Sequence, residues 1–171
     1  YKNGLINFIE KYNPIVIALN SQDSISHKFI NYRIGCHQVR LMADVDFHLK
    51  TKEPLIAPLS IFNGDLKKRL IDKKILDFGI VVQDGVFEFN NNFCKVPKSL
   101  VIAYSLATIA SGNASKVFMA GFDGYPVGDK RNEENNKKIE LFMQYSNLNL
   151  ISITPTNYNL KKKSVFGYLN Q

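Results

Sequence analysis

Short apolar runs alternate along this chain with longer segments in which apolar residues recur every three or four positions. The short runs predict buried strands, and they are residues 15–19, 32–36, 54–58, 75–82, 86–89, 117–120 and 150–153. The longer segments predict helices, and they are residues 2–12, 25–32, 38–49, 66–74, 97–111 and 132–145. Strands that alternate with helices are typical of an α/β fold, so we expect a doubly wound, mostly parallel sheet in a Rossmann-like three-layer sandwich.

The length of 171 residues fits a single domain with a sizeable core. The chain opens on the predicted helix 2–12, directly before its first strand. In nucleotide-binding α/β domains, a strand and a glycine-rich phosphate loop precede the first helix. We therefore interpret residues 1–171 as one Rossmann-like domain and as the carboxyl-terminal fragment of a longer protein.

The composition is that of an ordinary globular protein, with 45% hydrophobic and 22% charged residues. The net charge is +7, but the basic residues fall in short runs beside apolar residues and have no interleaved aromatic pattern. We therefore expect no nucleic-acid partner, whereas a small anionic ligand such as a nucleotide fits the positive field.

No apolar run approaches about 20 residues and no signal peptide is visible, which favours a cytoplasmic protein without a membrane span. Cys36 and Cys94 sit among apolar residues and are expected to be buried free thiols.

The segment Gly121-Phe122-Asp123-Gly124 follows the predicted strand 117–120. A buried strand that stops at small and acidic residues is typical of a ligand site at the carboxyl edge of a sheet. Gly121 and Gly124 would let a ligand approach the backbone, and Asp123 would accept hydrogen bonds from ribose or sugar hydroxyls. The alternative is a glycine-rich turn in which Asp123 caps its own loop.

Asp129 and Arg131 follow in the predicted loop 121–130, just before a helix for which Asn132 is the expected N-cap. An arginine at a helix start can clamp a phosphate group, and the helix dipole adds to the attraction. The alternative is an ion pair between Asp129 and Arg131 that orders the loop. Both interpretations fit the sequence.

Polar residues also end the first and last predicted strands. Asn20 and Ser21 follow the first strand, where an amide can recognise a base or a ribose, although asparagine is also a common turn residue. Thr154 and Thr156 end the last strand and are candidates to donate hydroxyl groups to a ligand, or to fix the turn at Pro155.

His37, at a predicted strand end, is the best-placed histidine for proton transfer. The spacing assembles no Ser-His-Asp or Cys-His arrangement and contains no zinc-type ligand pair.

Asp44 and Asp46 form an Asp-x-Asp pattern, with which some glycosyltransferases hold a divalent cation. On the predicted helix the two carboxylates point roughly 200° apart, so we expect no metal site.

Six segments together resemble the carboxyl-terminal domain of bacterial proteins of the 4-hydroxy-2-oxovalerate aldolase-like group, which are associated with surface polysaccharide synthesis. The segments are PIVIALN (14–20), CHQVRLMADVDF (36–47), PKSLVIAYSLA (97–107), AGFDGY (120–125), DKRN (129–132) and SITPTNYNL (152–160). The resemblance implies that the parent protein is a lyase and that an aldolase-like domain precedes this one in the same polypeptide. It also allows a homo-oligomer. The aldolase reaction itself needs a metal-bearing barrel, which this short chain cannot form.

More distantly, residues 97–125 are similar to the helix–strand unit of Rossmann-like bacterial sialyltransferases and hydroxymethylpterin diphosphokinase-like domains. In those sialyltransferases a strand-end Asn and a helix after a Ser/Thr-Gly site bind the cytidine nucleotide. The resemblance therefore implies nucleotide-binding roles for Asn20 and Ser99. Their catalytic His follows the Gly-x-Asp strand, whereas this chain has no His beyond residue 48.

These observations lead to the expectation of a nucleotide or nucleotide-sugar binding domain within a bacterial glycan-synthesis protein. No other cofactor is implied. The alternative is a non-catalytic accessory or oligomerisation domain of an aldolase-like lyase, with apolar side chains of the helix 2–12 as its interface. A glycosyltransferase-like activity would use His37 as the catalytic base.

Overall fold

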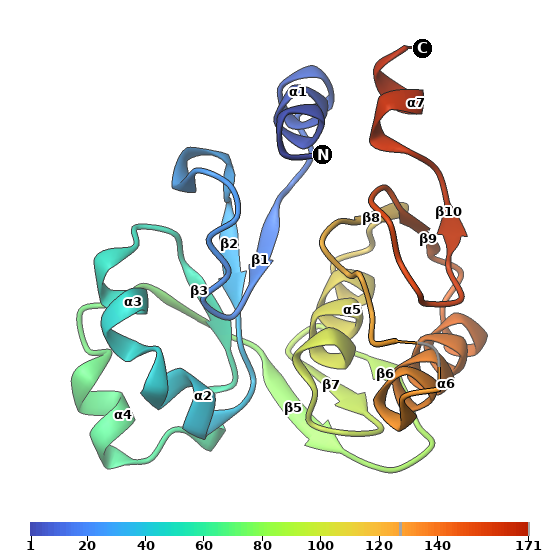
Figure 1. The fold of residues 1–171 in the computed structure, drawn as a ribbon. Coiled ribbons are helices and arrows are strands. Elements are labelled where there is room, and N and C mark those ends of the chain that lie inside the picture. The colour runs from blue at the N-terminus through green and yellow to red at the C-terminus, as the bar shows by residue number, and fades with distance from the viewer. Residues whose placement is uncertain (127, 171) are drawn as a thin grey trace. The chain divides into compact units, whose positions relative to one another are not determined.

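The protein is described by a computed structural model that covers residues 1–126 and 128–170 (Figure 1). The chain divides into two compact units: Tyr1–Pro14 with Asn113–Gln171 form the first, and Ile15–Gly112 form the second. Each unit contains a parallel sheet flanked by helices. The predicted α/β class, mostly parallel and consistent with a doubly wound Rossmann-like fold, is therefore confirmed.

The second unit is built on a four-stranded sheet, called sheet A, in the order β1-β2-β3-β4. Its strands are β1 (Ile17–Leu19), β2 (Tyr32–Ile34), β3 (Leu55–Ala57) and β4 (Ile75–Asp77). All neighbouring strands are parallel, so their carboxyl ends lie at one edge of the sheet. Each of these strands lies within a run predicted from the sequence.

A second sheet in the same unit, sheet B, has the order β5-β7-β6. Its strands are β5 (Gly79–Val82), β6 (Glu88–Phe89) and β7 (Phe93–Val96). The predicted strand 75–82 is divided at Phe78, because β4 pairs with β3 whereas β5 pairs with β7. Strand β7 was not predicted, and it displaces the start of the helix that the sequence placed at 97–111.

The helical segments of this unit are η1 (His27–Phe29), α2 (Gln38–Ala43), α3 (Val45–Lys50), η2 (Leu59–Ile61), α4 (Gly64–Arg69) and α5 (Val101–Ser111). The predicted helix 38–49 is interrupted at Asp44, which ends α2 and begins α3. Figure 1 shows α3 and α4 beside sheet A, and Leu41, Val45, Leu55 and Leu66 form the core between these helices and β3. This packing holds α2, α3 and α4 against sheet A.

The first unit is built on sheet C, in the parallel order β10-β9-β8. Its elements are α1 (Lys2–Tyr12), β8 (Lys116–Met119), α6 (Lys130–Tyr145), β9 (Asn149–Ser152), β10 (Lys161–Lys162) and α7 (Val165–Leu169). Asp129, rather than the predicted Asn132, is the N-cap of α6, because its carboxylate accepts a hydrogen bond from the Arg131 amide. Asn132 is buried inside the helix. Strand β10 and helix α7 were not predicted.

The apolar side of α1 is used within this unit. Phe8 is buried with Ile151, Ile153 and Val165, and its ring lies against Phe118. No helix in the described residues is long and apolar enough to cross a membrane.

Candidate functional site

The eleven candidate residues from the sequence fall into two groups, one in each unit. The second unit contains Asn20, Ser21, His37 and Ser99. The first unit contains Gly121, Asp123, Gly124, Asp129, Arg131, Thr154 and Thr156. We therefore consider two candidate sites, the carboxyl edge of sheet A and the carboxyl edge of sheet C.

Asn20 lies at the carboxyl edge of sheet A, immediately after β1. Its backbone is left-handed, with φ 51°, and its backbone N–H donates to the Ile34 carbonyl at the end of β2, 2.9 Å away. The side-chain Oδ1 lies 3.7 Å from the position that a Cβ would occupy on Gly35. That added Cβ would also come within 2.7 Å of the buried Leu41 side chain. A side chain at position 35 would force Leu41 to shift, and its absence leaves the side-chain amide of Asn20 beside the end of β2.

Ser99 reaches the same edge of sheet A from the segment before α5. Burial raises the pKa of the Cys36 thiol to about 11, and hydrogen bonding to the Ser99 side chain opposes that rise. Cys36 directly follows Gly35, so the contact places Ser99 next to the end of β2. Within the described residues, α5 has no side-chain cap and no acidic residue in its first turn. Its first amide groups are thus left to solvent or to a ligand.

A cluster of three side chains fixes an arginine near the end of β1. The Arg40 Nε and the Ser21 hydroxyl both donate to Oδ2 of Asp44 at 2.7 Å, and Arg40 Nη2 donates to Ser21 Oγ at 3.2 Å. Burial opposes ionisation of Asp44, but the hydrogen bonds from Ser21 and Arg40 outweigh it and lower the pKa of Asp44. The Asp44 side chain is 17% exposed, whereas that of Arg40 is 57% exposed. The cluster therefore presents a fixed guanidinium group to solvent.

Sequence reasoning missed Arg40. One signal was present, because Arg40 and Asp44 are four residues apart on a predicted helix, where such pairs meet. The contact with Ser21 spans 19 residues and depends on the fold, so no local pattern indicated it. Asp44 and Asp46 have different partners: Asp44 accepts from Arg40 and Asp46 accepts from Arg69, each at 2.7 Å. Among the described residues, no group of three or more His, Cys, Asp or Glu side chains is arranged to hold a metal ion.

A buried arginine holds the loop that carries Asn20 and Ser21. The Arg33 side chain in β2 is fully buried, and its Nη1 donates to the carbonyls of Gln22 at 2.7 Å and Asn20 at 3.4 Å. The guanidinium also lies 4.6 Å from the Phe47 ring centroid and 3.8 Å from the Glu53 carboxylate. Arg33 thus fixes the backbone after β1 from inside the unit.

The histidines of the chain all lie in the second unit. His37 is exposed at the start of α2, at the sheet edge predicted for it. His27 contacts the carboxylates of Glu53 at 2.8 Å and Asp23 at 3.3 Å. His48 is fully buried, and burial followed by repulsion from Lys73 lowers its pKa to about 4. His48 is therefore neutral at pH 7.

At the carboxyl edge of sheet C, the ends of β8 and β9 are joined by their own polar groups. The Gly121 amide, at φ 74°, donates to Thr154 Oγ1 at 2.9 Å. The buried Thr156 hydroxyl accepts from the Tyr158 amide at 3.1 Å. Asp123 is exposed, and its backbone carbonyl accepts from the Asn157 amide. These bonds use Thr154 and Thr156 to fix the turn at Pro155.

Gly124, Asp129 and Arg131 form the loop that follows. Gly124 has φ 82°, and an added Cβ would lie 3.2 Å from Asn132 Oδ1. Asp129 accepts from the Arg131 amide, Nε and Nη2 at 2.7–3.0 Å, and the guanidinium lies 4.1 Å from the Tyr125 ring centroid. The hydrogen bonds from Arg131 lower the pKa of Asp129. Val127, inside the predicted loop 121–130, lies outside the described residues.

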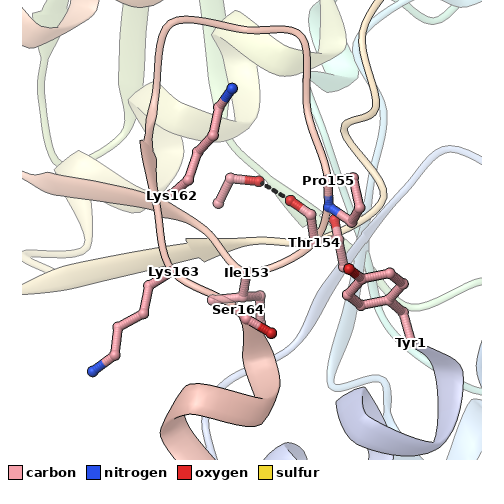
Figure 2. A pocket seen from close by; sticks show the side chains of 8 residues that line it. Tyr1, Ile153, Thr154, Pro155, Lys162, Lys163 and Ser164 are labelled. Carbon is pink, nitrogen blue, oxygen red and sulfur yellow. Dashed lines mark hydrogen bonds between the residues drawn. The ribbon is translucent and has the colours of Figure 1, made fainter.

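A small hollow lies at the end of β9 in the first unit (Figure 2). Its volume is about 170 Å³, and it is lined by Tyr1, Ser152, Ile153, Thr154, Pro155, Lys162, Lys163 and Ser164. Figure 2 shows the side chains of Lys162 and Lys163 extending in opposite directions. The Ser152 hydroxyl donates to the Thr154 carbonyl at 2.8 Å. Sites for drug-sized ligands have volumes of about 300 Å³ or more, so this hollow is too small to enclose a nucleotide.

Comparison of the chain with protein-family models, with curated proteins and with solved structures gave no match. The function is therefore inferred from the geometry of the two sheet edges.

Proposed function

We propose that this chain binds a nucleotide or a nucleotide-activated sugar at the carboxyl edge of sheet A. The observation that carries the proposal is the placement of Asn20 beside Gly35 and of Ser99 beside Cys36, within one unit. In doubly wound folds, ligands bind outside the carboxyl ends of the strands. The arrangement at this edge has the polar groups that such a ligand needs.

Each group has a chemical role in the proposed complex. The side-chain amide of Asn20 offers both a donor and an acceptor for a base or a ribose, and the described residues contain no hydrogen-bond partner for it. The hydroxyl of Ser99 and the uncapped start of α5 face the polar part of the ligand, where helix amides and dipole favour negative charge. Because Arg33 fixes the loop after β1, Asn20 needs little reorganisation to bind.

The larger context is also part of this proposal. We place the chain in a bacterial glycan-synthesis protein, after an aldolase-like lyase domain in the same polypeptide. In a glycosyltransferase-like reaction His37 would act as the base. The assignment of Gly121, Asp123 and Arg131 to a ligand stays a prediction for the first unit.

The alternative function, an accessory or oligomerisation domain, needs a free apolar surface on α1. In the first unit Phe8 and Ile9 of α1 are buried, and Lys11 and Tyr12 donate to carbonyls of α7. The apolar side of α1 thus already has a packing role, so we favour ligand binding.

Calorimetric titration with cytidine and uridine nucleotides tests the proposal, with Asn20→Gly as the key variant. Glycine removes the amide and tolerates the left-handed backbone at this position. We expect the wild-type protein to bind one of the nucleotides and Asn20→Gly to weaken that binding about tenfold, the loss of roughly one good hydrogen-bonding group.

The matched control is Asn113→Gly, because Asn113 is exposed and has a similar φ of 55°. It should leave the affinity unchanged. The proposal fails if the wild-type protein binds no nucleotide, or if the two variants weaken binding equally.

A further inference from the structure

Three arginines pair with aspartates at 2.7 Å among the described residues: Arg40 with Asp44, Arg69 with Asp46, and Arg131 with Asp129. An ion pair on the protein surface contributes little to the free energy of unfolding, so a contribution to stability does not explain why these pairs are formed. The three pairs differ in what else holds the guanidinium group. That difference separates Arg40 from the other two.

Arg40 is held at two points by two elements of the second unit. Its Nε donates to Asp44 at the end of α2, and its Nη2 donates to Ser21, directly after Asn20 at the end of β1. By contrast, Arg131 gives its Nε and Nη2 to the single carboxylate of Asp129, two residues away. Arg69, in α4, gives its Nη2 to Asp46 and its Nη1 to the Met42 sulfur at 4.0 Å, so both of its contacts are with helical segments. Of these three arginines, only Arg40 is tied to the end of a strand in sheet A.

Arg40 retains unused donors at this edge. A guanidinium group has five N–H bonds, and the described residues offer Arg40 partners only at Nε and at one Nη2 hydrogen. Nη1 and the second Nη2 hydrogen belong to a side chain that is 57% exposed. These donors form the planar fork that matches two oxygens of a phosphate group.

We propose that Arg40 binds the phosphate group of the ligand, and that Ser21 and Asp44 are positioning residues which hold the guanidinium in place. This inference rests on the proposed function and narrows the ligand to a phosphorylated one, such as a nucleoside diphosphate or its sugar ester. Asn20 is adjacent to Ser21 in the chain, so one loop brings the nucleoside-binding amide and the anchor of the phosphate-binding group together. Fixing the arginine in the free protein lowers the entropy that it loses on binding.

The experiment compares uridine with uridine diphosphate, and cytidine with cytidine diphosphate, by calorimetric titration. The variants are Arg40→Gln and the matched control Arg69→Gln. Arg69 is also paired with an aspartate at 2.7 Å and is 46% exposed, so the control removes a similar surface pair. We expect Arg40→Gln to weaken diphosphate binding about tenfold or more and to leave nucleoside binding unchanged. Arg69→Gln should change neither.

Asp44→Asn tests the positioning role, because it keeps Arg40 and removes the carboxylate that orients it. We expect a smaller loss of diphosphate affinity, about threefold to tenfold, with nucleoside binding unchanged. Thermal unfolding of each variant shows whether the fold is intact.

The possible failures are distinguishable. If the wild-type protein binds neither nucleosides nor diphosphates, the proposed function and this inference both fall. If the wild-type protein binds a diphosphate no more tightly than the nucleoside, or if Arg40→Gln and Arg69→Gln behave alike, nucleotide binding stands and the role of Arg40 is overturned.

Discussion

The carboxyl edges of sheets A and C contain the same kinds of side chain but use them differently. At sheet C, the Gly121 amide is bound by Thr154, and Asp129 takes three donors from Arg131. At sheet A, the described residues offer no partner to the side-chain amide of Asn20, and Arg40 is held from two elements, by Ser21 and by Asp44. Polar groups that satisfy one another fix a turn, whereas polar groups that are held in place with donors to spare are suited to a ligand. This contrast is why the account favours sheet A.

The largest effect is expected at Arg33, which holds the sheet A edge from inside the second unit. Arg33→Met should destabilise the protein by about 3–5 kcal/mol, because it removes the guanidinium from the buried Glu53 and from the carbonyls of Asn20 and Gln22. Arg69→Met, which removes an exposed pair, should cost about 1 kcal/mol or less. Urea unfolding measures both values. A loss below 1 kcal/mol for Arg33→Met would mean that the loop after β1 is not fixed by this residue.

The second expected effect is that the free energy of unfolding depends on pH, through His48 in the second unit. The pKa of His48 is about 4 in the folded protein, against 6.5 for an ordinary histidine. Burial is the main cause of the lowered pKa, and repulsion from Lys73 is the next. Arg33 also lowers the pKa of His48, whereas Asp44 raises it. The unfolded chain therefore takes up a proton first, and stability should fall as the pH drops from about 6.5 to 4. A difference of about 2.5 pKa units corresponds to about 3 kcal/mol.

Urea unfolding at a series of pH values between 7 and 4.5 measures this loss, with His48→Met as the comparison. Methionine is about as large as histidine and does not titrate, so the variant should lose much less stability over that range. Parallel curves for the two proteins would show that His48 does not carry the effect. The first unit has no histidine and should contribute nothing to it.

The third and smallest effect compares a glycine from each edge. Gly35→Ala places a Cβ 2.7 Å from the buried Leu41 side chain, so we expect a loss of about 1–3 kcal/mol and weaker nucleotide binding. Gly121→Ala meets no atom within 4 Å and costs only the backbone strain at φ 74°, about 1 kcal/mol. It should leave binding unchanged. Unfolding and calorimetry on both variants measure these outcomes, and weaker binding only in Gly121→Ala would move the site to sheet C.

The apolar runs predicted most of the fold because buried strands and helix faces have a clear period. Strand β10 escaped notice because Lys161 and Lys162 are polar and exposed, so no hydrophobic signal marks it. Strand β7 was missed because it is short and directly precedes Pro97. Proline favours the first turn of a helix, so the sequence predicted that a helix begins at Pro97. Asp129 and Asn132 are both good capping residues, and only the folded loop distinguishes them.

The candidate site was predictable only in part. Asn20 and Ser21 follow a strand, and that position alone indicated a polar edge. The contact of Ser21 with Arg40 joins residues far apart in sequence, and the approach of Ser99 to Cys36 spans a still longer stretch. Such contacts depend on tertiary packing, which local periodicity does not encode. Whether a polar group keeps spare donors is likewise decided by its neighbours in the fold.

The most direct test of the central claim is to map nucleotide binding on the backbone amides by NMR, with uridine diphosphate and cytidine diphosphate as the probes. The account predicts that chemical-shift changes concentrate at Asn20, Gly35, Arg40 and Ser99, while Gly121 and Asp129 are unaffected. Changes that concentrate at Gly121 and Asp129, or no changes at saturating nucleotide, would contradict it.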